Sequence, residues 1–344
     1  MWGAPTDMKA TRTWIACRRR IWSRVGYTSR VGVCAAVLMF VLWAPSIKAQ
    51  NLTGLGEGST ALAVSGDGSV VVGYIPRANP WNTDAFRWNE SGGMQLLGGF
   101  DGGWHSSNAH AVSANGTVVV GRSSYRGRSE AYRWTESGGM QNIQDEQYSW
   151  VSSYANAVNA DGSVVVGAIR WGYTTTAFRW TDAGGMQGLG HVARWRGTGP
   201  GYAEIRALDV NADGSGVVGD SNTSYGRYVA FRCTGAGGLH RLGTLGPYGG
   251  SRASGVNADG SVVVGYSASS NGSEAFRWTA AGGMQGLGDL AGGRFYSDAT
   301  SVNADGSVVV GSGSSDNGSE AFYWTARRGM RSLASVLKGC LLYT

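Results

Sequence analysis

Residues 256–288 read VNADGSVVVGYSASSNGSEAFRWTAAGGMQGLG, and close copies of this stretch fill most of the 344-residue chain. The dipeptide Asp259-Gly260 precedes a β-branched run at residues 262–264, which is the strongest local signal for a β-hairpin. Residues 275–278 alternate apolar and polar side chains, and Gly282-Gly283 then turns the chain into another short apolar run. Because the stretch lacks helical periodicity, it predicts one antiparallel β unit.

The unit recurs six times, at intervals of 48, 46, 52, 46 and 46 residues. The Val-Val-x-Gly motif ends at Gly73, Gly121, Gly167, Gly219, Gly265 and Gly311. The aromatic-x-Trp motif ends in the same register at Trp88, Trp134, Trp180, Cys233, Trp278 and Trp324. A fixed period of this size indicates a propeller, a solenoid or an array.

Each copy contains four predicted strands, which is the content of one propeller blade. The sequence therefore predicts an all-β fold, a propeller-like domain of about six four-stranded blades. The alternative is a β-solenoid with two rungs per repeat, which needs parallel ladders. Asp-Gly and Gly-Gly at the two short connections favour antiparallel hairpins and hence the propeller. We expect the five repeat Trp side chains to be buried in equivalent places, and Cys233, which replaces the sixth, to be buried and unpaired.

The chain divides into three predicted parts. Residues 1–49 combine a basic region, Arg18-Arg19-Arg20, with an apolar run at residues 31–43 and a small residue, Ala49, before a cleavage point. This order is typical of a secretory signal peptide read by the Sec pathway. The alternatives are a membrane anchor, for which the run is shorter than the roughly 20 residues required, and a twin-arginine signal.

Residues 50–334 form the predicted six-copy β-repeat domain, and residues 335–344 form a tail. The stretch Leu52–Gly56 resembles an isolated fourth strand, although the sixth copy has a fourth strand of its own. The tail is therefore interpreted as part of a further, truncated repeat.

The positive net charge belongs to the predicted leader. Of 29 basic and 23 acidic residues, eight and one fall in residues 1–49, which leaves 21 basic and 22 acidic residues. A nearly neutral mature chain argues against a nucleic-acid partner. Membrane contact is expected only through the signal peptide or through a C-terminal anchor that this sequence lacks.

The repeated motifs A-x-x-V-N-A-D-G-S-V-V-V-G, A-F-R-W-T and G-G-M-Q-x-L-G resemble those of the HAF family of bacterial extracellular repeat proteins, over residues 52–334. The family is named after a His-Ala-Phe run. Its His position holds Asp84, Glu130, Thr176, Val229, Glu274 and Glu320 here, so no role of that His transfers. The resemblance implies export in a Gram-negative-type bacterium, no established catalysis, and autotransporter passengers among the relatives.

Residues for catalysis, metal binding or cofactor binding are not evident. Each Asp-Gly turn supplies one carboxylate and the second copy has Asn115 instead, so turn geometry explains the pattern better than a calcium site. The histidines His105, His110, His191 and His240 lack ligand spacing. The third predicted strand carries an arginine that we expect to lie between sheets and bond to backbone carbonyls. These residues are Arg87, Arg133, Arg179, Arg232 and Arg277.

The long connections supply the candidate binding residues. In a four-stranded antiparallel blade, the loops after the second and fourth strands lie on one face and only tight Gly turns lie on the other. The candidates on these loops are Trp104, Trp150, Trp195, Arg194, Arg196, Tyr248 and Phe295. Exposed aromatic and Arg side chains suit recognition, and the alternative is that the rings cap the blade edges.

These observations predict an exported, non-enzymatic module at the cell surface that binds or adheres to an extracellular glycan or protein. One alternative is a propeller hydrolase of extracellular polymers. It would need acidic residues at the centre of the blades, where the sequence predicts hydrophobic strands and glycines. A second alternative is an autotransporter passenger fragment with a display or spacer role.

Overall fold

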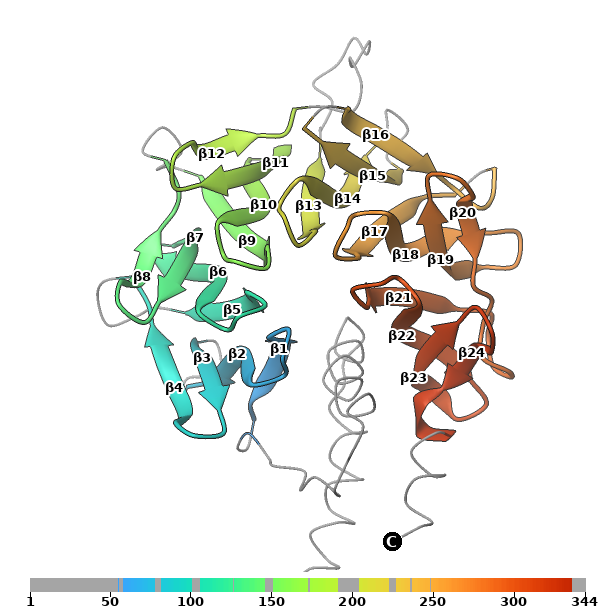
Figure 1. The fold of residues 1–344 in the computed structure, drawn as a ribbon, viewed down its shortest axis with the longest axis horizontal. Helices are drawn as coiled ribbons and strands as arrows, with labels where there is room; N and C mark the ends of the chain where they lie inside the picture. Colours follow the sequence, from blue (N-terminus) through green and yellow to red (C-terminus); the bar gives the residue numbers. More distant parts are fainter. Residues whose placement is uncertain are drawn as a thin grey trace, which may run out of the picture. The chain divides into compact units, whose positions relative to one another are not determined.

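Each sequence copy forms one four-stranded sheet in the computed structural model. The structure describes residue 55 and residues 58–335, apart from residues 78–81, 101–105, 126, 146–150, 173, 191–203, 223–226, 236 and 248. The predicted signal peptide and the tail at residues 336–344 lie outside the described residues, as do residues 52–54. The described part contains six four-stranded sheets (Figure 1), each with its strands in sequence order.

The strands of each sheet are numbered from the inside outwards (Figure 1). The innermost strands are β1 (Thr60–Val64), β5 (Ser107–Val112), β9 (Ser152–Val158), β13 (Ile205–Val210), β17 (Ser251–Val256) and β21 (Ser297–Val302). The second strands are β2 (Val70–Pro76), β6 (Val118–Tyr125), β10 (Val164–Trp171), β14 (Gly216–Asn222), β18 (Val262–Ala268) and β22 (Val308–Ser315). The third strands are β3 (Thr83–Asn89), β7 (Arg128–Thr135), β11 (Thr174–Thr181), β15 (Tyr228–Thr234), β19 (Ser273–Thr279) and β23 (Gly318–Thr325). The outermost strands are β4 (Gly93–Gly98), β8 (Gly139–Asn142), β12 (Gly185–Gly188), β16 (Gly238–Gly243), β20 (Gly283–Gly286) and β24 (Gly329–Ser332).

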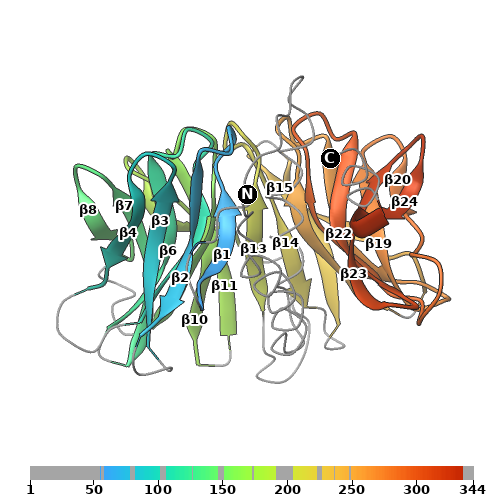
Figure 2. The same ribbon diagram turned by 90° about the horizontal axis from the view of Figure 1, so that it is seen from below.

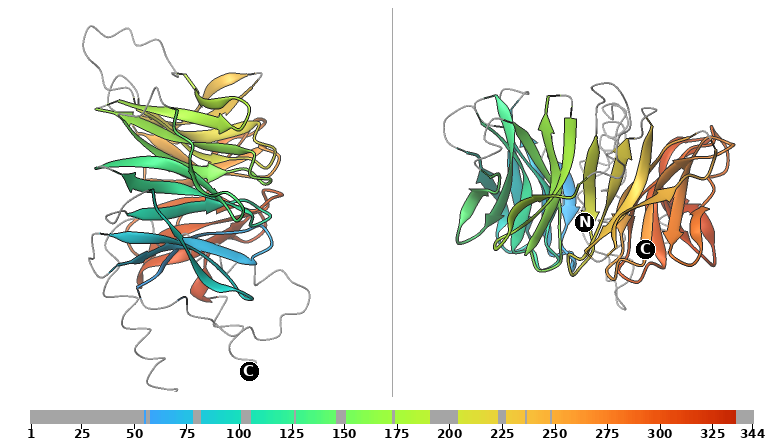
Figure 3. Two further views of the ribbon diagram at one scale, coloured as in Figure 1. Left: turned by 90° about the vertical axis from the view of Figure 1, so that its left-hand side faces the viewer. Right: turned by 90° about the horizontal axis from the view of Figure 1, so that it is seen from above.

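All pairings between these strands are antiparallel, which confirms the predicted hairpins and excludes the solenoid. Figure 2 shows the sheets edge-on, with their strands running from one face of the propeller to the other. Because strand direction alternates, the tight turns after the first and third strands lie at one end of every sheet. The connections after the second and fourth strands lie at the opposite end, which we call the loop face (Figure 3).

The Asn-Ala-Asp-Gly-Ser motif forms the turn between the first two strands of a sheet. In the fifth sheet Asn257 Oδ1 accepts the Val262 N–H at 2.8 Å, and Asp259 Oδ1 accepts the Ser261 N–H at 2.8 Å. Gly260 adopts a φ of 76°, which glycine tolerates without strain. The hydrogen bond with the Ser261 side chain lowers the pKa of Asp259. The turn carboxylate therefore serves the hairpin, as the sequence indicated.

Hydrophobic side chains pack between neighbouring sheets. One cluster, for example, joins Val118 and Val120 of the second sheet to Val165 and Phe178 of the third. The fully buried aromatic of each third strand precedes the repeat Trp by two residues. These side chains are Phe86, Tyr132, Phe178, Phe231, Phe276 and Phe322.

The expectation that the repeat Trp side chains are buried is wrong in four of five cases. All five share one register, facing Met on the outermost strand, but only Trp134, at 5 % exposure, is buried. The other four are half-buried. The repeat Trp lies near the turn to the outermost strand. The fully buried aromatic residue two positions earlier lies in the middle of the sheet, where it is paired with the glycine of the second strand. Cys233 occupies the place of the repeat Trp, and it is half-buried and unpaired rather than buried.

The turn that follows the innermost strand also forms a hydrogen bond to the next sheet. Backbone N–H groups of Gly66, Ala114, Ala160, Ala212 and Ala258 each donate to the carbonyl of the equivalent turn in the following sheet, at 2.9–3.2 Å. The third-strand arginine adds a second bond of this kind. Arg277 Nε, for example, donates to the Gly306 carbonyl oxygen at 3.4 Å. Arg87, Arg133 and Arg179 make the equivalent bond, which confirms the prediction for four of the five arginines. The prediction is wrong for Arg232, whose Nε is buried without a hydrogen-bond partner.

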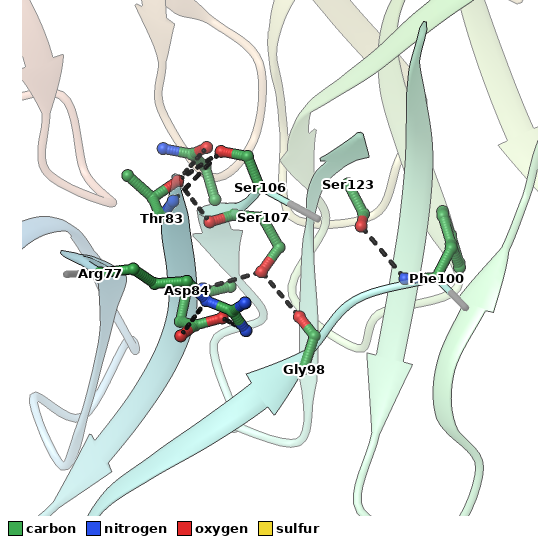
Figure 4. A network of polar contacts seen from close by, with 10 residues as sticks. Arg77, Thr83, Asp84, Gly98, Phe100, Ser106, Ser107 and Ser123 are labelled. Atoms are coloured by element: carbon green, nitrogen blue, oxygen red, sulfur yellow. Dashed lines mark hydrogen bonds and ion pairs between the residues drawn. The ribbon is translucent and has the colours of Figure 1, made fainter. Parts of the chain in front are cut away.

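A buried serine at the start of the innermost strand ties neighbouring sheets together on the loop-face side (Figure 4), except between the third and fourth sheets, where Ile205 takes its place. Ser107 of β5 accepts a hydrogen bond from the Ala85 N–H at 2.9 Å and donates to the Gly98 carbonyl at 2.6 Å, both in the first sheet. Ser251 and Ser297 repeat the arrangement in the fifth and sixth sheets. These contacts give a rigid frame on which loop-face residues are held. No helix in the described part of the chain is long and apolar enough to cross a membrane.

Candidate binding site

One cross-strand pair differs in every sheet, although the pair next to it on one side is the same in all six. It pairs a residue of the innermost strand with the residue after the Val-Val-x-Gly glycine. The pairs are Thr60–Tyr74, Asn108–Arg122, Tyr154–Ala168, Arg206–Asp220, Arg252–Tyr266 and Asp298–Ser312. The adjacent pair is Ala opposite Gly in every sheet. We call the variable pairs the inner row.

The inner row lies toward the loop face. Arg206 is the second residue of β13, directly after a long connection, and Asp220 is the third residue from the end of β14. Strand alternation thus places charged and aromatic side chains on the inner strands, beneath the variable loops. A recognition surface usually combines a constant scaffold with variable polar side chains near the loops.

The strongest contact in the inner row is the ion pair between Arg206 and Asp220. Arg206 Nε and its terminal nitrogen each lie 2.9 Å from one oxygen of Asp220, whose side chain is 1 % exposed. The guanidinium carbon also lies 4.7 Å from the centre of the Tyr228 ring, and the Tyr228 hydroxyl donates to Glu204. Bidentate geometry of this kind holds both side chains in one orientation.

Arg252 extends this network into the fifth sheet. Its Nε lies 3.6 Å from Asp220 Oδ2, which is an ion-pair distance but too long for a hydrogen bond. Arg252 Nε is buried and has no hydrogen-bond partner, and the same is true of Asp298 Oδ1 in the sixth sheet. Burial raises the pKa of Asp298 to about 6, although the positive charge of Arg252 opposes the shift.

Aromatic side chains accompany the charges. Arg122 lies over the Tyr154 ring, with its guanidinium carbon 5.6 Å from the ring centre. Tyr296, just before β21, is 39 % exposed. Burial, the Asp298 carboxylate and Tyr266 together raise the pKa of Tyr296, so these groups lie close to one another.

His110 lies on β5, two residues from Asn108 of the inner row. Its Nδ1 lies 2.8 Å from the Ala155 carbonyl oxygen of the third sheet. Burial lowers the pKa of His110 to about 4, despite that hydrogen bond, and the charge of Arg122 lowers it further. His110 is therefore a neutral structural group. The described residues contain no group of His, Cys, Asp and Glu side chains that could hold a metal ion.

Of the seven predicted binding residues, the structure places Phe295. It is half-buried on the connection between β20 and β21, beside Gly272 of the β18–β19 loop. The other six lie outside the described residues, namely Trp104, Trp150, Trp195, Arg194, Arg196 and Tyr248. The structure adds Trp171, which is 64 % exposed at the loop-face end of β10.

Reasoning from the sequence missed the inner row. The expectation that the inner strands hold only hydrophobic residues and glycines is wrong, because Asp220 and Asp298 lie there. A signal was present: the residue after each Val-Val-x-Gly motif changes from copy to copy while the motif itself is kept.

Solved structures resemble this fold. A prolyl endopeptidase matches with a TM-score of 0.56 at 13 % identity, over 96 % of this chain and 49 % of that protein. Oligogalacturonate lyase in complex with manganese matches with a TM-score of 0.51 at 14 % identity, over 79 % of this chain and 75 % of the lyase. TolB from Acinetobacter baumannii matches with a TM-score of 0.44 at 14 % identity, over 64 % of this chain and 52 % of TolB.

Together with the six four-stranded sheets, the structural matches show that this chain is a β-propeller protein. The chain spans about half the length of TolB and of the prolyl endopeptidase that it matches. No protein-family model and no curated protein matches the sequence. At these identities the likeness extends to the fold alone.

Proposed function

We propose that the protein is an exported, non-enzymatic binding or adhesion module, whose glycan or protein ligand docks on the loop face. The observation that supports this most directly is the inner row: a repeated scaffold presents a different pair of side chains in each sheet, polar or charged in most of them, next to connections that also differ. A residue needed only for folding would recur in all copies, as the Ala–Gly pair does.

The predicted leader at residues 1–49 and the resemblance of the repeats to the HAF family support export to the cell surface or the extracellular space. Aromatic residues on the loop face support binding. Trp171 is exposed and Phe295 half-buried there, and Trp and Tyr are the side chains most often responsible for binding energy.

The test is binding of the full chain to glycan and protein arrays, followed by titration of Trp171→Ala and Phe295→Ala against the best ligand. Loss of one ring at a binding site typically costs about 1–3 kcal/mol, so we expect roughly 5–150-fold weaker binding with little change in stability. Glu136→Ala, on an exposed turn at the opposite face, is the matched control. Unchanged binding with a large loss of stability would mean that the rings are structural caps.

One observation favours the alternative of a hydrolase. Asp298 has a pKa of about 6 and lies beside a second charged group, Arg252, and a carboxyl group of raised pKa can act as a general acid. A hydrolase would release reducing ends or peptides from polymers incubated with the full chain. Asp298→Asn would abolish that release, whereas a binding module would release nothing.

A further inference from the structure

Two of the unpaired buried polar atoms lie in the inner row. Among the described residues, four buried side-chain atoms have no hydrogen-bond partner: Arg232 Nε, Arg252 Nε, Asp298 Oδ1 and Ser332 Oγ. Arg252 and Asp298 occupy the same register position of successive innermost strands, β17 and β21. A donor and an acceptor without partners thus lie in neighbouring sheets at the loop-face end.

Leaving such atoms unpaired costs free energy. A buried donor or acceptor without a partner destabilises a protein by about 1–3 kcal/mol, so its retention calls for an explanation. Apolar residues at these two positions would avoid the cost. A ligand that bonds to both groups accounts for their presence.

The charges around the two groups limit the ligand. Arg252 by itself would attract an anion, but Asp220 lies 3.6 Å from its Nε, and the Asp298 carboxyl is close as well. An anion would be repelled by these carboxylates and a cation by Arg252. A hydroxyl group is uncharged, accepts a hydrogen bond from a guanidinium and donates one to a carboxylate.

An aromatic ring completes the arrangement. Tyr296 and Asp298 are separated by one residue in an extended chain, so their side chains leave the same side of the strand. The side chain of Arg252 is 37 % exposed and Tyr296 is 39 % exposed, so both can be reached from solvent. Flat aromatic faces pack against the C–H faces of sugar rings.

We propose that Arg252 and Asp298, with the ring of Tyr296 beside them, form a subsite for an uncharged saccharide. The proposal rests on the proposed binding function and names its ligand class. A peptide fits less well, because strand addition uses a series of backbone groups along a strand edge. Here the unpaired atoms are one donor and one acceptor next to one ring.

The test titrates the full chain with neutral hexasaccharides of glucose, galactose, mannose and N-acetylglucosamine, with a galacturonate hexasaccharide, and with a set of decapeptides. The variants are Arg252→Met, Asp298→Asn and Tyr296→Ala. The controls are Arg327→Met and Asp182→Asn, which alter exposed side chains on turns of the opposite face. We expect a neutral hexasaccharide to bind, each variant to weaken it by about 10-fold or more, and each control to change it by less than about 2-fold.

A second readout separates binding from folding. The bound hexasaccharide should raise the unfolding temperature of the parent protein and of the controls, and raise it much less in the three variants. Asp298→Asn keeps the shape of the side chain, so it tests the carboxylate even if another variant fails to fold.

The outcomes distinguish the two proposals. Neutral saccharide binding that survives all three variants overturns this subsite but keeps the binding function. Binding only to decapeptides, or only to galacturonate, also overturns the saccharide subsite and leaves a binding module of another specificity. Absence of binding to every probe overturns both proposals.

Discussion

Gly265 faces the Arg252 carbonyl so closely that a Cβ on the glycine would lie 1.9 Å from the carbonyl oxygen. The equivalent glycine of every sheet has the same relationship with its inner-row neighbour, at 1.9–2.0 Å, and these glycines are Gly73, Gly121, Gly167, Gly219 and Gly311. The final residue of the Val-Val-x-Gly motif is therefore glycine because the innermost strand passes against it. This contact also sets the position of the inner row.

Gly265→Ala should destabilise the protein by about 3–5 kcal/mol or prevent folding, because backbone atoms, which cannot rotate away, block the added methyl group. Denaturant unfolding followed by circular dichroism measures the loss. The control is Gly235→Ala, at an exposed turn where an added Cβ meets nothing within 4 Å. A change below about 1 kcal/mol at Gly265 would contradict the close approach.

Arg277→Met should lower the free energy of unfolding by about 1–2 kcal/mol, because it removes the bond from Arg277 Nε to the Gly306 carbonyl between the fifth and sixth sheets. Met retains most of the apolar stem of the arginine, so the loss of unfolding free energy measures the contribution of the guanidinium group. Urea unfolding measures it, with Arg327→Met on an exposed turn as control. Equal effects of the two substitutions would show that the bond between sheets contributes nothing.

Cys233→Trp should raise the free energy of unfolding by about 1 kcal/mol, because it restores the ring that the other copies carry. Cys233 is paired with Val217 and Leu239 in the register used by Trp, and the site is half-buried, so a large ring can reach solvent. Guanidinium unfolding of the variant beside the parent is the measurement. A loss of stability would show that the fourth sheet has closed around cysteine.

Asp298→Asn should stabilise the protein at pH 7.5 but not at pH 3.5. The pKa of Asp298 is raised from 3.8 to about 6 in the folded state, so the folded protein holds the proton more tightly than the unfolded chain. Ionisation therefore costs stability: the cost is complete above about pH 6, falls as the pH drops, and vanishes below about pH 4. The full cost is on the order of 2–3 kcal/mol.

Urea unfolding of the parent and of Asp298→Asn across this pH range tests the prediction. The difference between the two proteins should shrink steadily toward low pH. Asp182→Asn alters an exposed carboxylate and should show no such trend. A difference that does not change with pH would rule out a buried, ionising Asp298.

Local chemistry explains why so much of the fold could be predicted. The turn at Asp259-Gly260 and the alternation at residues 275–278 act within a few residues, so they indicate hairpins without reference to the rest of the chain. The arginine series was predicted for a similar reason. In the second copy Asn115 replaces the turn Asp, yet Arg133 is present, so the arginine does not depend on the Asp of its own turn. Arg133 bonds instead to Gly162 of the next sheet.

The sequence by itself thus determined the six repeats, their antiparallel strands and the face that carries the long connections. The tertiary structure alone decided that Phe276 rather than Trp278 is fully buried, because burial depends on the neighbouring sheets. It also decided the inner row. Asp220, Arg252 and Asp298 belong to three copies, and only the packing of successive sheets brings their side chains close to one another. The raised pKa of Asp298 follows from that packing, which removes its carboxylate from water.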